Sequence, residues 1–152
     1  MPTQLSLERT IHAAPQTVFA VQSDISNWAD LVPAITKVEM LTDGPVQVGT
    51  RFRETRVMFG KEATEEMEIV EFNAPTNYVL HAESHGSKYR SEFRFEPAPD
   101  GTKLIFNFEA EPQTTFAKVM GFLMKPMMKK MLDLCGKDLD AVKAHIEALE
   151  SA

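Results

Sequence analysis

The sequence predicts an α+β fold in which an antiparallel sheet of about seven strands packs against a long C-terminal helix. Two observations carry this prediction. Between residues 35 and 111, short apolar runs are separated by Gly, Pro, Asn and Asp, the pattern of an antiparallel meander. Between residues 114 and 149, apolar residues recur every three or four positions, the period of a helix with one buried face. With 152 residues and no linker or internal repeat, we expect one domain spanning residues 1–152.

Composition excludes several classes of function. The formal net charge of −6 argues against a nucleic-acid partner, because phosphate binding requires a basic face. Cys135 is the single cysteine and cannot form an internal disulfide. The first residues show no signal-peptide pattern, and no run reaches the roughly 18 apolar residues of a membrane span, so we expect a cytoplasmic, soluble protein.

The N-terminal segment predicts one strand followed by two short helices. Apolar and polar residues alternate from Leu5 to Ile11, with Arg9 on the apolar side, where we expect it at the open end of the sheet or in an ion pair. Pro15 suits the first turn of a helix, and Pro33 ends the second helix. Trp28, the only tryptophan, is expected to fill the seam between these helices and the sheet.

Six further strands are expected around residues 38–40 and at 49–59, 63–72, 78–84, 89–96 and 103–110. In the last two strands aromatic or aliphatic residues alternate with charged ones, so one face of the sheet should be apolar and the other wet. Residues 51–72 instead carry charge at both parities. We therefore expect these strands to be the weakest part of the core and to form a wall of a cavity.

The C-terminal helix should be broken. A continuous helix over residues 114–149 would be about 50 Å long, more than a domain of this size is wide. Gly121 and Pro126 predict a first segment at 113–124, a bend, and a main helix at 126–150. Five of the nine methionines lie at this bend, where adaptable side chains would suit a cavity wall or gate.

The order of elements and several local motifs resemble the START-like (SRPBCC) superfamily, most closely its polyketide cyclase/dehydrase and lipid-transport branch. The motifs lie at residues 8–19 (ERTIHAAPQTVF), 24–28 (DISNW), 32–33 (VP), 48–52 (VGTRF), 100–102 (DGT) and 139–147. The resemblance implies a helix-grip fold, in which a curved sheet wraps the terminal helix around a deep hydrophobic cavity. The chain lacks the glycine-rich loop of the plant-allergen branch and the two-His-one-carboxylate iron motif of the ring-hydroxylase branch.

A metal site is not expected. His81 and His85 stand four residues apart, which on a strand separates them by about 13 Å, too far to share one ion. We therefore predict no metal and no cofactor.

Three functions remain open. The favoured interpretation is a non-enzymatic protein that binds a hydrophobic small molecule or lipid between sheet and helix. The residues expected to line the site are Phe52, Met58, Met67, Tyr89, Phe93, Phe106, Met120, Leu123, Met124 and Met127.

The second hypothesis is a cyclase or dehydratase. It would use His81, Glu54 or Glu66 as the base and Arg56 or Tyr89 to stabilise developing charge. The charged members of this set are equally compatible with cross-strand ion pairs on a wet surface.

The third hypothesis is a protein-interaction module of the same fold. Independently of these three, the lysines at 118, 125, 129 and 130 would suit transient contact with anionic lipid, and they are equally compatible with a solvated helix back.

Overall fold

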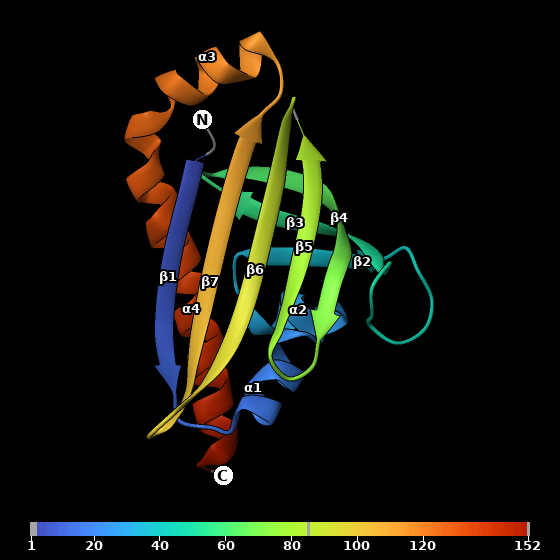
Figure 1. The fold of residues 1–152 in the computed structure, drawn as a ribbon, viewed down its shortest axis with the longest axis vertical. Coiled ribbons are helices and arrows are strands. Elements are labelled where there is room, and N and C mark those ends of the chain that lie inside the picture. The colour runs from blue at the N-terminus through green and yellow to red at the C-terminus, as the bar shows by residue number, and fades with distance from the viewer. Residues whose placement is uncertain (1–2, 85, 152) are drawn as a thin grey trace.

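The computed structural model describes residues 3–84 and 86–151 (Figure 1). The strands are β1 (Thr3–Ile11), β2 (Ile35–Met40), β3 (Arg51–Met58), β4 (Lys61–Asn73), β5 (Asn77–Ser84), β6 (Ser87–Ala98) and β7 (Gly101–Pro112). The helices are α1 (Pro15–Gln22), α2 (Trp28–Leu31), α3 (Thr115–Leu123) and α4 (Met128–Glu150), with 3-10 turns η1 (Ile25–Asn27) and η2 (Lys125–Met127).

The strands form one antiparallel sheet in the order β1-β7-β6-β5-β4-β3-β2, which confirms the predicted meander. β1 is the edge strand next to β7 and pairs with it so that Leu7 lies opposite Phe106. Register shifts in β2 and β4 mark bulges, which increase local twist and bend the strands. Figure 1 shows the result: a curved sheet in front, with α4 running behind β1 and β7.

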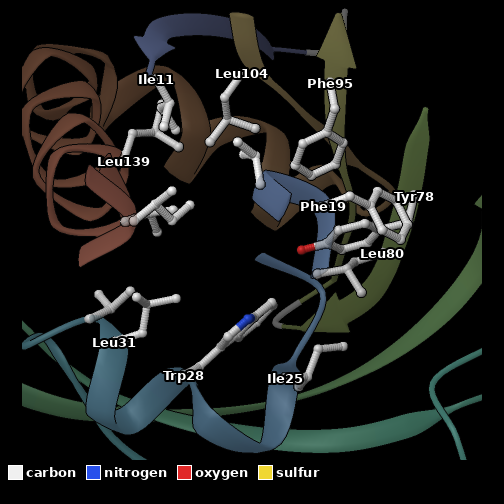
Figure 2. Close-up of a cluster of buried hydrophobic side chains, with 14 of the residues drawn as sticks. Ile11, Phe19, Ile25, Trp28, Leu31, Tyr78, Leu80, Phe95, Leu104 and Leu139 are labelled. Atoms are coloured by element: carbon white, nitrogen blue, oxygen red, sulfur yellow. The ribbon is translucent and has the colours of Figure 1, made fainter. Parts of the chain in front are cut away.

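The core lies where α1, α2 and the second half of α4 meet the sheet (Figure 2). Phe19 packs edge-on against Phe95 with ring centroids 5.0 Å apart. Trp28 is buried, and its indole N–H donates to the Gln22 carbonyl at 2.9 Å. The tryptophan therefore fills the seam between helices and sheet, as expected from the sequence.

The C-terminal helix is broken close to the predicted position. Thr114 caps α3 by accepting a hydrogen bond from the Ala117 amide at 3.0 Å. α3 ends at Leu123, η2 contains Pro126, and α4 follows as a separate helix. In Figure 1, α3 lies across the upper end of the sheet and α4 turns down behind it. Proline lacks the amide hydrogen that a continuing helix requires, which explains the break.

Polar contacts fix α4 against β1. Arg9 donates to Asp140 at 2.6 Å, so this cation is paired rather than left at an open sheet end. Lys143 donates to the Thr10 carbonyl at 2.8 Å. Among the described residues, no helix has the length and apolar character needed to cross a membrane.

Candidate functional site: a cavity between the sheet and α4

A cavity of about 340 Å³ lies between the sheet and the first half of α4. Most of its wall is carbon. The apolar lining comes mainly from β5, β6, β7 and α4, and includes Leu80, Ala82, Phe93, Phe106, Phe108, Met131, Leu139 and Val142. The Phe93 and Phe106 rings pack on each other with centroids 4.9 Å apart, which gives the wall a rigid aromatic face.

Another part of the wall is formed by the charged strands β3 and β4. Side chains alternate along a strand, so Glu54, Arg56 and Met58 of β3 face inward together. β4 contributes Ala63, Glu65 and Met67 in the same way. The inward-facing side chains of these two strands therefore border the cavity and do not fill it.

A cluster of three charged side chains joins this part of the wall to α4. The Arg56 Nε donates to Glu54 Oε1 at 2.7 Å, and its Nη1 donates to Asp138 Oδ2 of α4 at 2.9 Å. Glu54 is only 5% exposed, whereas Arg56 and Asp138 each retain about a fifth of their side-chain exposure. The cluster bridges the sheet and the helix across the cavity wall.

The environment of the cluster shifts its protonation equilibria. Burial alone would lower the pKa of Arg56, but Glu54 and Asp138 outweigh burial and raise that pKa, so the guanidinium stays charged. Burial raises the pKa of Asp138, and Arg56 offsets this only in part. A carboxyl group whose pKa is raised in a cavity is a candidate proton donor or acceptor.

Burial also changes the pKa of Cys135 and Tyr89, which line the cavity. Burial, together with Asp138, raises the pKa of Cys135 to about 11, so its thiol is protonated at neutral pH. Burial and then Glu65 raise the pKa of Tyr89. Both groups therefore present neutral hydrogen-bonding side chains to the cavity.

Gln22 of α1 adds a polar group to the cavity lining. Gln22 is 5% exposed and borders the cavity. Its Nε2 donates to the Tyr78 hydroxyl at 3.4 Å, and that hydroxyl donates to the Gln22 carbonyl at 2.8 Å. The side-chain oxygen Oε1 is buried without a hydrogen-bond partner in the described part of the chain. A ligand hydroxyl or a water molecule could supply the missing donor.

The structure brings part of the predicted lining together. Met58, Met67, Tyr89, Phe93 and Phe106 all border the cavity. Whether they contact a ligand stays a prediction.

The other predicted lining residues lie elsewhere. Phe52 is fully buried against Trp28, with ring centroids 5.5 Å apart, and does not border the cavity. Met120, Leu123 and Met124 are exposed, and together with Met127 they lie outside the wall. This differs from the expectation because the break at η2 carries α3 past the end of the sheet.

The candidate catalytic residues also separate. Glu54, Arg56, Tyr89 and His81 border the cavity. Glu66 lies on the outer face and pairs with Arg51 at 3.2 Å, because the neighbouring β4 positions 65 and 67 point inward. His85 lies outside the described residues. Within residues 3–84 and 86–151, no group of His, Cys, Asp and Glu side chains is arranged to hold a metal ion.

Sequence reasoning missed Gln22 of α1 and Glu65 of β4. On α4 it missed Asp138 and Cys135. Both lie on the same helical face as Met131, Leu139 and Val142, at spacings of three and four residues. That periodicity places them on one face of the helix, but only the rotation of α4 shows that this face borders the cavity.

The chain matches the family model described as polyketide cyclase/dehydrase and lipid transport over residues 2–147. The chain belongs to this family. The match spans almost the whole sequence and agrees with the curved sheet, the terminal helix and the cavity between them. A search of curated proteins finds no significant match.

Solved structures share the fold at low sequence identity. TTHA0849 from Thermus thermophilus aligns with a TM-score of 0.79 and 18% identity, over 97% of this chain and 99% of that one. The ZhuI aromatase/cyclase from Streptomyces sp. R1128 aligns with a TM-score of 0.77 and 17% identity, over 97% and 94%.

A plant protein shows the same likeness. The ginseng major latex-like protein 151 from Panax ginseng aligns with a TM-score of 0.76 and 12% identity, over 95% of this chain and 97% of that one. At these identities the likeness shows the helix-grip fold and no more.

Proposed function

We propose that this protein binds a hydrophobic small molecule or lipid in the cavity between the sheet and α4. The observation that carries the proposal is the cavity itself, with its largely carbon lining and a few polar groups. Its volume of about 340 Å³ lies within the range of roughly 300–1,000 Å³ typical of small-molecule sites.

The charges on the lining favour a neutral ligand over a fatty-acid anion. Arg56 is the guanidinium that borders the cavity, and Glu54 and Asp138 border it as well. Arg56 already directs Nε and Nη1 to these two carboxylates. A buried ligand carboxylate would therefore have to compete with Glu54 and Asp138 for Arg56, which is costly in a poorly hydrated site.

The test is ligand-induced stabilisation with two probes, neutral aminoanthracene and anionic palmitate. At a free concentration 100 times the Kd, a ligand adds about 2.7 kcal/mol of stability, which raises the Tm of a protein this size by about 5–10 °C. We expect this shift with aminoanthracene and a smaller one with palmitate. The proposal fails if neither probe shifts the Tm and the purified protein carries no ligand by native mass spectrometry.

A matched pair of variants locates the binding. Ala82 is buried on the cavity lining, so Ala82→Phe should fill the space and remove the shift. Ala144 is exposed on α4, so Ala144→Phe should leave the shift unchanged. Equal shifts in the two variants would place the probe outside the cavity.

A second candidate function is acid–base catalysis of a cyclisation or dehydration. The observation favouring it is that Glu54, Arg56 and Asp138 converge on a cavity whose lining also includes Tyr89. Asp138, with its raised pKa, would exchange the proton, and Arg56 would stabilise an enolate oxygen.

The enzyme hypothesis predicts turnover of an aromatic poly-β-ketone into a cyclised, dehydrated product. Asp138→Asn should lower kcat at least about 100-fold, the usual contribution of a general acid or base, with ligand affinity retained. Binding without turnover in the parent protein would leave the non-enzymatic function.

A further inference from the structure

The segment around α3 exposes several large apolar side chains to solvent. Phe116, Phe122 and Leu123 are 73%, 69% and 63% exposed, and Val119, Met120 and Met124 are also exposed. We call these six residues the α3 apolar surface. Single exposed apolar residues are ordinary, but a group gathered on one short helix and its C-cap marks an interaction site.

The attachment of α3 explains why this surface is open. Ala117 is the buried residue of the helix. The helix start is held by the β5–β6 turn, where the Gln113 amide donates to the Gly86 carbonyl at 2.7 Å. Gly86 has a φ of +78°, and an added Cβ would lie 2.8 Å from Thr114 Oγ1, so only glycine permits this approach. Beyond this anchor, α3 projects past the sheet end (Figure 1).

Charge around the α3 apolar surface identifies its partner. Residues 112–132 contain four lysines (118, 125, 129 and 130) and no acidic residue, in a chain whose formal net charge is −6. All four lysines are exposed. The Lys125 ammonium lies 5.3 Å from the centroid of the Phe122 ring, so a cation and an aromatic ring occupy one point of the surface. Apolar anchors combined with lysines match the chemistry of an anionic bilayer surface.

We propose that the α3 apolar surface and its four lysines dock this protein onto anionic phospholipid membranes. The aromatic and aliphatic side chains enter the headgroup–acyl boundary, and the lysines extend to the lipid phosphates. Docking places η2 and the first turns of α4 at the bilayer, and Met131 on those turns borders the cavity. The membrane surface would therefore lie close to the part of the cavity wall that Met131 forms. The docking itself does not rest on the proposed ligand binding.

The first test is co-sedimentation with two kinds of vesicle, phosphatidylcholine alone and phosphatidylcholine mixed with phosphatidylglycerol. We expect binding to the mixed vesicles, weakened by added salt, and little binding to the neutral ones. Lys125→Gln and Lys129→Gln should each lower the affinity about fivefold, since one lysine near an anionic surface contributes roughly that factor. Lys103→Gln on β7, outside the surface, is the control and should have no effect.

Phe116→Ser with Phe122→Ser should abolish binding without unfolding the protein, because both rings are mostly exposed. Leu149→Ser is the matched control, because Leu149 is an exposed apolar residue at the other end of α4. A second copy of the chain is the competing occupant. If the double variant converts a dimer to a monomer in light scattering and vesicle binding is unchanged, the proposal is overturned.

The depth of insertion gives a readout independent of affinity. Trp28 is buried, so Phe122→Trp adds an exposed indole whose emission should shift to the blue on vesicle addition. Brominated lipid should quench it at a depth of about 5–10 Å. Leu149→Trp should show neither effect. The absence of quenching at position 122 in sedimented protein would mean that the contact is electrostatic only, and would overturn insertion of the apolar surface.

Discussion

α3 and the second half of α4 carry apolar residues at the same helical spacing, but those of α4 are buried and those of α3 are exposed. In the second half of α4, Leu139, Val142 and Ile146 are buried against the sheet and the short helices. In α3, Phe116, Met120 and Leu123 recur at the same spacing and lie exposed. The comparison teaches that helical periodicity defines a face, whereas the neighbouring elements decide what covers it. Between these two segments, the first turns of α4 border the cavity.

The largest expected effect contrasts these two segments directly. Ile146 is fully buried, so Ile146→Ala should lower the free energy of unfolding by about 2–5 kcal/mol, through lost burial and the cavity left behind. Leu123 is mostly exposed, so Leu123→Ala should change it by no more than about 0.5 kcal/mol. Urea unfolding followed by circular dichroism measures both. Similar losses would mean that α3 is packed in solution.

The next effect concerns the two faces of β3. Arg56→Met leaves Glu54 and Asp138 facing each other without a cation, and should cost about 3 kcal/mol, the lower end for a broken buried pair because Arg56 and Asp138 keep some exposure. Arg51→Met breaks an exposed pair with Glu66 and should cost at most about 1 kcal/mol. Equal losses would contradict a special role for the inward-facing cluster.

A smaller effect concerns Glu92 of β6, whose carboxylate accepts hydrogen bonds away from the cavity lining. Burial alone would raise the pKa of Glu92, but hydrogen bonds from Asn77, Asn107 and Arg94 outweigh it and lower that pKa. The unfolded chain therefore binds this proton more readily, so the network stabilises the fold above the ordinary glutamate pKa. That stabilisation is lost as pH falls through the folded pKa.

Glu92→Gln should therefore lower the free energy of unfolding at pH 7 by about 1 kcal/mol, with the difference vanishing in acid. Urea titrations between pH 7 and pH 3 measure this. A constant difference across the range would show that the carboxylate charge is not involved.

Much of the fold could be predicted because its signals are local. Alternation in β6 and β7 indicated which aromatic residues face inward, including Tyr89, Phe93 and Phe106. Pro126 indicated where the C-terminal helix breaks. The charge at both parities of β3 and β4 indicated a cavity wall.

The rest of the site depends on relations that one sequence does not encode locally. Pro126 says where the helix ends but not in which direction α3 leaves, so Met120 and Met124 could not be excluded from the lining. Asp138 joins the site only through the rotation of α4 relative to Arg56, 82 residues away in the chain. Glu66 required the strand register, because a shift of one residue reverses its face.

The most direct test of the central claim uses Cys135, the single cysteine of the chain, as a reporter inside the cavity. With its pKa raised to about 11, the thiol should react slowly with N-ethylmaleimide at neutral pH, and about tenfold faster per unit of rising pH. Saturating aminoanthracene should slow this labelling at least tenfold, as measured by mass spectrometry. Labelling at an unchanged rate in protein that has bound the probe would place the ligand elsewhere and contradict the account.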